Sequence, residues 1–232
     1  MSTLLSDLNP EQRLAVQHDD GPLLVAAGPG SGKTRVITHR IAYRVLESGV
    51  SPSRILAVTF TNRAAREMSE RVGALVGDDT RVPVGTFHWM CAGILRRYIH
   101  LLGNRSNFRV LTPRESHQVL RSLLPTHATS STRHTGTVAD AISGLKSGVE
   151  DAGVARDFGI PEDELARLRL AYDERLRAMN ALDLDDLPAL AGRVLREHES
   201  CKNTCRSALD ELLVDEYQDT NLIQQELVEL LC

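Results

Sequence analysis

Short apolar runs alternate with amphipathic stretches in the first 88 residues and again near residue 215. Residues 23–27 read Leu-Leu-Val-Ala-Ala and lead into a glycine-rich turn, which predicts a buried strand of a parallel sheet. Similar runs predict three further strands, over residues 55–60, 82–87 and 212–215. Pro83 marks the second of these as a strand start or an edge, because proline cannot donate to a sheet ladder.

Helical spacing of apolar residues fills the intervals between these strands. It predicts a helix over 34–46, a second from Asn62 as N-cap to Gly77, and a third over 223–231. Strands that alternate with helices are typical of an α/β fold with a parallel sheet.

The middle of the chain has a different pattern. Residues 89–208 show helical spacing and polar loops, with a Ser/Thr/His-rich loop over 126–137, but no clear strand. We therefore expect an α-helical insertion over 89–208 within an α/β domain made of residues 1–88 plus 209–232.

Composition excludes several classes of protein. The 232 residues are 42% hydrophobic and 25% charged, which is typical of a globular domain. We expect no membrane segment and no secretion signal, and therefore a cytoplasmic location. The spacing of the four cysteines predicts no disulfide framework; reduced thiols are favoured over a metal site at Cys201 and Cys205.

Charge is unevenly distributed although the net charge is only −4. Residues 89–149 carry +6 and residues 150–200 carry −6. The basic residues of the first block are Arg96, Arg97, Arg105, Arg109, Arg114, Arg121, Arg133 and Lys146. They could form a face that contacts nucleic-acid phosphates, or simply a solvated helical surface.

A phosphate-binding loop follows the first predicted strand. It consists of Ala27, Gly28, Pro29, Gly30, Ser31, Gly32, Lys33 and Thr34. The pattern matches G-x-x-x-x-G-K-[ST] except for alanine at the first glycine. Its backbone N–H groups and the helix N-terminus would surround phosphates, Lys33 would reach the β- and γ-phosphates, and Thr34 would hold Mg²⁺.

A carboxylate pair follows the last predicted strand. Asp215 is suited to bind Mg²⁺, and Glu216 to activate or orient the water that attacks the γ-phosphate. Lys33, Asp215 and Glu216 are therefore the candidate catalytic residues, with Mg–ATP as the ligand.

Six blocks in order closely resemble the UvrD/Rep/PcrA family of superfamily 1 DNA helicases. They are LNPEQ, AAGPGSGKTR, AVTFTNRAAREM, VGTFH, ALDLDDL and LLVDEYQDTN. The resemblance covers nearly the whole chain and is weakest from about 104 to 178. It implies a RecA-like ATP-binding domain split by a helical subdomain, and family members also carry alanine at the position of Ala27.

The resemblance assigns roles to further residues. Gln12 would read the adenine edge, Arg35 would lie against the adenine and ribose, and Gln218 with Asp219 would couple the nucleotide site to the DNA site. The implied contacts with single-stranded DNA are Thr59, Phe60, Thr61, Asn62, Gly85, Thr86, Phe87 and His88. Phe60 and Phe87 could instead be core aromatics. Asp183, Asp185 and Asp186 form an acidic turn near the implied DNA path, or only cap and position helices.

The same resemblance implies parts that this sequence lacks. A second motor domain should follow in cis or in trans, so we expect a C-terminally truncated motor that unwinds nothing alone. The expected partners are single-stranded and duplex-junction DNA. The function is either that of the ATP-binding half of a DNA helicase or that of a non-catalytic nucleotide- and DNA-binding module.

Overall fold

The computed structural model describes residues 3–19, 21–124, 135–148 and 151–232. The chain divides into two compact units, which are described separately. The first comprises Met1–Met90, Asn203–Thr220 and Leu231–Cys232, and the second comprises Cys91–Lys202 and Asn221–Leu230. Within the described residues, no helix has both the length and the apolar composition needed to cross a bilayer.

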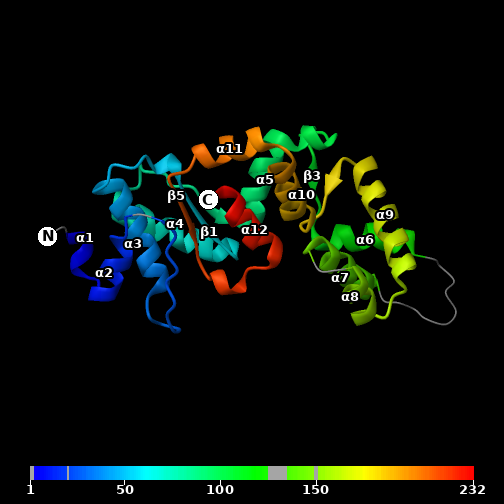
Figure 1. The fold of residues 1–232 in the computed structure, drawn as a ribbon, viewed down its shortest axis with the longest axis horizontal. Helices are drawn as coiled ribbons and strands as arrows, with labels where there is room; N and C mark the ends of the chain where they lie inside the picture. The colour runs from blue at the N-terminus through cyan, green and yellow to red at the C-terminus, as the bar shows by residue number, and fades with distance from the viewer. Residues whose placement is uncertain (1–2, 20, 125–134, 149–150) are drawn as a thin grey trace. The chain divides into compact units, whose positions relative to one another are not determined.

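The first unit is built on a three-stranded parallel sheet. The strands are β1 (Ile55–Thr59), β2 (Val84–Thr86) and β5 (Glu211–Val214), in the order β2-β1-β5. Figure 1 labels β1 and β5, which lie side by side. The helices of the unit are α1 (Thr3–Ser6), α2 (Pro10–Val16), α3 (Lys33–Leu46), α4 (Asn62–Val76) and the start of α5 (Phe87–Tyr98), with a 3₁₀ turn at Pro52–Arg54 and another at Tyr217–Asp219. The predicted α/β class, with a parallel sheet flanked by helices, is confirmed.

Helices α3 and α4 pack on one face of this sheet. The buried cluster joins Ile41 of α3, Ala57 of β1, Met68 of α4 and Leu213 of β5. All five residues of β1 are buried, as expected of the central strand of a parallel sheet. Because parallel strands end at one edge, the carboxyl ends of β1, β2 and β5 lie together there.

The predicted strand at residues 23–27 is wrong. Residues 22–28 are without regular structure, and Leu24 is 76% exposed. A strand is stable only where a neighbouring strand satisfies its backbone N–H and C=O groups, and no strand of the described residues pairs with this segment. Its apolar composition therefore does not produce a strand here.

The start of the second predicted helix also needs a correction. Thr61, not Asn62, is the N-cap of α4, and its side chain accepts a hydrogen bond from the N–H of Ala64 at 3.1 Å. Its extended backbone allows that bond, whereas Asn62 is already the first helical residue.

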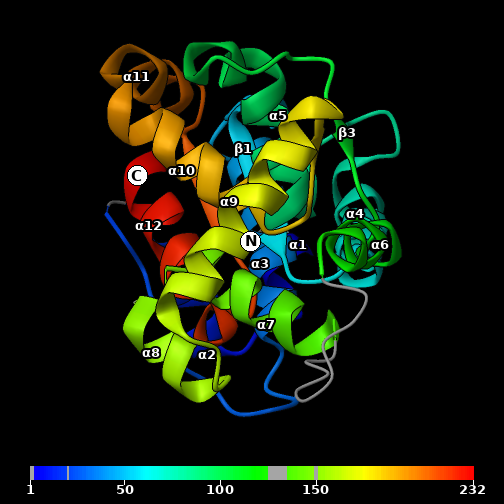
Figure 2. The ribbon, with the colours of Figure 1, turned by 90° about the vertical axis from the view of Figure 1, so that its right-hand side faces the viewer.

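The second unit is mainly helical. It contains most of α5, a 3₁₀ turn at Ile99–Leu102, α6 (Pro113–Leu123), α7 (Thr135–Lys146), α8 (Asp151–Asp157), α9 (Glu162–Ala178), α10 (Asp186–Glu197), the start of α11 (Glu199–Ser207) and α12 (Leu222–Leu231). Figure 2 shows α6, α7, α8 and α9 from the side where they face the viewer.

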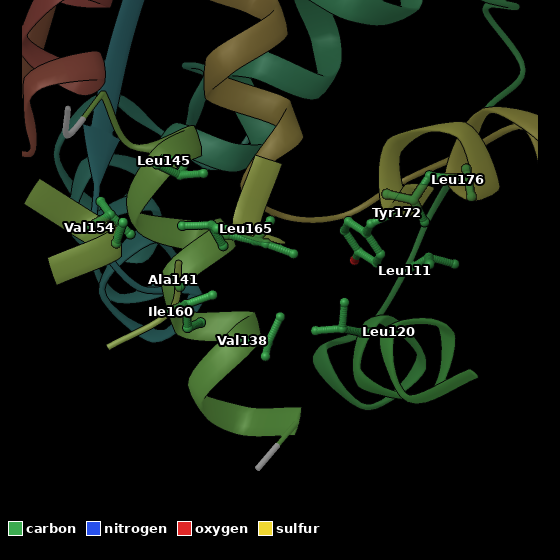
Figure 3. Packing of buried hydrophobic residues seen from close by; sticks show 13 residues of the cluster. Leu111, Leu120, Val138, Ala141, Leu145, Val154, Ile160, Leu165, Tyr172 and Leu176 are labelled. Atoms are coloured by element: carbon green, nitrogen blue, oxygen red, sulfur yellow. The ribbon is translucent and has the colours of Figure 1, made fainter. Parts of the chain in front are cut away.

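The core of this unit lies among α6, α7, α8 and α9. Leu120 of α6, Val138 of α7 and Tyr172 of α9 point toward a common interior (Figure 3), and each is at most 3% exposed. Leu165 of α9 and Ile160 extend the same apolar cluster. Burial of these side chains holds together segments that the sequence separates by polar residues.

The prediction that residues 89–208 contain no strand is wrong in one detail. Strands β3 (Arg109–Val110) and β4 (Ala181–Leu182) pair in parallel, with Arg109 opposite Ala181. Two residues are too short a run to be recognised as a strand from sequence. The two strands also lie far apart in the sequence, so no local pattern indicates that they pair. The predicted loop at 126–137 lies mostly outside the described residues, as does Arg133, but α7 already begins at Thr135.

The functional domain boundaries at 88/89 and 208/209 stay a prediction. The compact units differ from them chiefly in α12, which groups with the second unit although the sequence placed it in the nucleotide-binding domain.

Candidate nucleotide-binding site and the adjacent sheet edge

The loop from Ala27 to Lys33 contains two glycines whose backbone lies in the left-handed region. Gly30 and Gly32 have φ values of 75° and 88°, a region that side chains disfavour. Gly32 is also the N-cap residue of α3, so the loop leads directly into a 14-residue helix. The whole segment from 21 to 31 is exposed, which leaves the loop open to a ligand.

Lys33 folds its side chain back over this loop. Its Nζ donates to the carbonyl oxygen of Ala27 at 3.0 Å and to that of Gly28 at 3.4 Å. The hydroxyl of Ser31 also donates to Gly28 O, at 2.7 Å. The ammonium group is thus held at the loop by neutral acceptors, and an anionic phosphate oxygen is a stronger partner for it than a carbonyl.

Thr34 and Asp215 meet although 181 residues separate them. The Oγ1 of Thr34 donates to Oδ2 of Asp215 at 3.5 Å, from the first turn of α3 to the end of β5. Burial raises the pKa of Asp215, the charge of Glu216 raises it further, and Thr34 and Lys33 oppose the shift. A hydroxyl and a buried carboxylate brought together are the oxygen ligands that Mg²⁺ prefers.

Glu216 is exposed and directly follows Asp215, the candidate metal ligand. Its φ of 52° lies in the left-handed region, which only a few non-glycine residues adopt. The side-chain amide of Gln218 donates to its Oε2 at 2.5 Å. Glu216 is therefore exposed and held by a neighbour, a placement suited to orienting a water molecule.

Gln12 reaches the loop from α2. Its Oε1 accepts from the N–H of Asn9 at 3.0 Å in a capping box, and its Nε2 donates to Ser31 O at 3.0 Å. Each end of the amide thus makes one hydrogen bond within the protein, although an amide oxygen can accept two and an NH₂ group can donate two. Arg35 is exposed and forms a 3.9 Å ion pair with Asp7.

The candidate DNA segments meet at the same edge of the sheet. Thr59 of β1 pairs in register with Thr86 of β2, and the N–H of Asp215 donates to Val58 O at 2.9 Å. Asp215, Thr59 and Thr86 therefore form a row across three strands, at about 5 Å per step.

The residues of these segments differ in their exposure to solvent. Thr59, Gly85, Thr86 and Phe87 are buried, Phe60 and His88 are half-buried, and Thr61 and Asn62 are exposed. Phe87 is only 2% exposed and its ring packs edge to face with that of Phe60, with 5.8 Å between centroids. Of the two alternatives for Phe87, this placement favours the core aromatic.

The sequence reasoning missed Trp89 at this edge. It is the only tryptophan of the chain and is 52% exposed at the start of α5. Its position two residues after Phe87 could have indicated it, because residues two apart in a helix lie on nearly opposite faces.

The acidic turn at Asp183–Asp186 has the structural role that was left open. The N–H of Asp183 donates to Oδ2 of Asp186 at 3.0 Å, and the N–H of Asp186 donates to Oδ1 of Asp183 at 2.8 Å. The two carboxylates therefore cap each other's backbone at the start of α10. Lys146 is buried beside them, so its inclusion in a phosphate-contacting basic face is wrong.

Almost the whole chain matches a known protein family. Residues 8–232 match the family model described as the UvrD/REP helicase N-terminal domain. The chain is 39% identical over 237 residues to the ATP-dependent DNA helicase PcrA of Staphylococcus aureus (strain NCTC 8325 / PS 47), covering 100% of this chain and 32% of that protein. It is 44% identical over 237 residues to the ATP-dependent DNA helicase UvrD1 of Mycobacterium tuberculosis (strain CDC 1551 / Oshkosh), covering 97% of this chain and 30% of that protein. The chain thus spans about a third of the length of these relatives.

Proposed function

Because the chain belongs to the UvrD/REP helicase N-terminal domain family, we propose that it is the ATP-binding part of an ATP-dependent DNA helicase. The observation that supports this best is the meeting of Thr34 and Asp215 beside a loop with Lys33 at its end. These groups come from opposite ends of the chain, and phosphoryl transfer from Mg–ATP requires them together.

We assign each of these residues a role in ATP binding or hydrolysis. The backbone N–H groups of 28–34 and the Lys33 ammonium would hold the phosphates, and Thr34 and Asp215 would hold Mg²⁺, which would supply positive charge beside the phosphates. Glu216 orients the attacking water and accepts its proton. Gln12 and Arg35 contact the adenine side, and Gln218 holds Glu216.

The row of Asp215, Thr59 and Thr86 supports a link between ATP and DNA. Phosphate at the loop and single-stranded DNA at Thr61 and Asn62 would both contact one edge of one rigid sheet. A structural change at Asp215, after β5, would then have to be transmitted over only about 10 Å to the residues at the ends of β1 and β2.

Unwinding of duplex junctions belongs to the proposal for the whole protein, since this chain spans about a third of its relatives. A second motor domain, in cis or in trans, would complete the ATP site. The presence of Lys33, Thr34, Asp215 and Glu216 together favours an enzyme over a non-catalytic binding module.

Calorimetric titration with Mg–ATP tests the nucleotide site. Lys33→Ala should abolish the measured binding, because the loop loses its cation while the α3 helix keeps its first turn. Lys202→Ala is the matched lysine control: Lys202 pairs with Glu199 on α11, and its loss should leave the affinity unchanged. Equal affinities for wild type and Lys33→Ala would refute the proposed site.

A further inference from the structure

Trp89 is an exposed aromatic at the edge where the candidate DNA segments meet. All nine aromatic side chains of the protein lie within the described residues, and Trp89 alone among them is exposed. It is 52% exposed, in the first turn of α5, directly after β2. Aromatic burial is strongly favourable, so an open indole at this edge calls for a reason.

The position of the indole is defined by the strand before it. Gly85 has no side chain, and a Cβ there would lie 2.2 Å from Cε3 and 2.6 Å from Cδ2 of Trp89. The benzo ring therefore lies directly against the backbone of Gly85. The N–H of Trp89 also donates to Oγ1 of Thr86 at 3.2 Å, which fixes the first turn of the helix.

The surroundings of Trp89 suit a nucleic-acid strand. Helices α4 and α5 both begin at this edge, because they follow the paired strands β1 and β2. Exposed Asn62, Arg63 and Arg66 lie in the first turns of α4. Helix N-termini and arginines attract phosphates, and an exposed ring at the same edge offers a flat surface to a base.

We propose that Trp89 stacks on a base of single-stranded DNA bound at this edge, with Gly85 holding the indole in place. The inference rests on the proposed DNA-binding function and gives it a specific contact. The neighbouring aromatics are less available, because Phe87 is buried and Phe60 packs against it. Stacking on one base typically strengthens binding about 5- to 100-fold and tolerates any base.

The chain provides its own reporter, since Trp89 is its only tryptophan. The experiment titrates the 232-residue protein with fluorescein-labelled oligo-dT at low salt and follows anisotropy, and with unlabelled oligo-dT to follow tryptophan emission. A strand of equal length and charge with abasic sites serves as the second probe. If Trp89 stacks on a base, oligo-dT should quench the tryptophan emission to saturation, with the same midpoint concentration as the rise in anisotropy. The abasic strand should bind more weakly and quench the emission little.

Three variants test the contact. Trp89→Ala should bind oligo-dT about 5- to 100-fold more weakly but bind the abasic strand as wild type does. Trp89→Phe should recover part of the affinity, because it restores an aromatic face. Gly85→Ala should displace the indole, shift its emission and lower the affinity for oligo-dT.

The control is Leu46→Ala, which removes a side chain of similar exposure, 53%, from the last residue of α3. It should change neither affinity nor quenching. Thermal melts of all variants identify any loss through misfolding, and Trp89→Phe keeps the test decisive if Trp89→Ala fails to fold.

The outcomes separate the two proposals. Saturable anisotropy with unquenched tryptophan, or equal quenching by oligo-dT and the abasic strand, would overturn stacking and leave DNA binding in place. Absence of binding to either strand by the wild type at low salt would overturn both for this chain.

Discussion

The Nζ atom of Lys146 lies 2.8 Å from Oδ2 of Asp183, and the two side chains are only 4% and 9% exposed. Oδ1 of Asp186 is 2.7 Å from the same ammonium group, Oδ1 of Asp173 is 3.6 Å away, and the ring of Tyr172 lies 4.9 Å from it. Burial lowers the pKa of Lys146, but the charges of the three aspartates together outweigh it and raise that pKa above its ordinary value. One cation thus joins the end of α7 to the start of α10.

Removal of this cation should destabilise the fold strongly. Lys146→Met keeps most of the side-chain volume but leaves Asp183 and Asp186 buried without their partner, which typically costs about 3–5 kcal/mol. Denaturant unfolding measures the loss. Arg105→Met, at an exposed position of the same unit, should change the unfolding free energy by less than about 0.5 kcal/mol. A loss for Lys146→Met no larger than that of Arg105→Met would contradict the role given to the cluster.

The stability contribution of Asp186 should fall as the pH rises between about 4 and 6. Burial raises the pKa of Asp186 to about 6, Asp183 adds to the shift, and Lys146 opposes it. The folded state therefore binds this proton more tightly than the unfolded state, whose pKa is near 3.8. Linkage then makes protonation stabilising below about pH 4, and this stabilisation is lost by pH 6, with an upper bound of about 3 kcal/mol.

The comparison that isolates this effect is wild type against Asp186→Asn, which stays neutral at every pH. The unfolding free energy of the variant relative to wild type should rise from pH 4 to pH 6 and then level off. A difference that does not change with pH would show that Asp186 does not titrate in this range.

Phe87 should affect folding more than Phe60 does. Phe87 is 2% exposed, so Phe87→Ala leaves a cavity and should cost about 3–5 kcal/mol, which a thermal melt detects. Phe60 is half-buried, so Phe60→Ala should cost less stability. If Phe60 also contacts a base, its removal should weaken oligo-dT binding by roughly 1–3 kcal/mol. Equal melts for the two variants would reject this assignment of core and edge.

Gln12 should make the site prefer adenine nucleotides. Its amide is already positioned at the loop by Asn9 and by Ser31 O, and an amide can both donate to and accept from the adenine edge. Loss of a buried hydrogen bond to the base costs about 1–3 kcal/mol, so Gln12→Ala should narrow the ATP-to-GTP affinity ratio in calorimetry. Gln17→Ala, an exposed glutamine after the end of α2, is the control and should leave the ratio as it is. An unchanged ratio in Gln12→Ala would remove Gln12 from base recognition.

Glu211 should anchor α3 to the start of β5. Arg40 donates to both of its carboxylate oxygens, at 3.2 and 2.8 Å, and Arg44 Nε lies 2.9 Å from Oε1. Arg40 also donates to His18 O after α2, at 2.6 Å. Glu211→Ala leaves two largely buried arginines without their carboxylate, so chemical denaturation should show a loss of about 3–5 kcal/mol. The exposed pair of Arg63 with Glu67 gives the contrast: Glu67→Ala should leave the unfolding free energy nearly unchanged, because solvent screens this pair.

Much of the local structure could be predicted from sequence. The strands β1, β2 and β5 and the helices α3, α4 and α12 arise from apolar residues at strand or helix spacing, and the structure has them within a few residues. Glycine at 30 and 32 predicted a turn with positive φ, and both adopt it. These features depend on neighbours within a few residues, so a linear pattern determines them.

The sequence by itself thus determined the α/β class, the glycine turn that leads into α3 and the pairing of a hydroxyl residue with a strand-end carboxylate. Tertiary structure alone decided which groups have partners. The apolar run at 23–27 forms no strand because no described strand pairs with it, and Lys146 is withdrawn from the basic surface because three aspartates surround it. Phe87 is buried and packs against Phe60, whereas Trp89, two residues later, is exposed and lies against Gly85. The sequence shows which side chains prefer burial and which need a partner of opposite charge. Only packing between distant segments determines whether those preferences are satisfied.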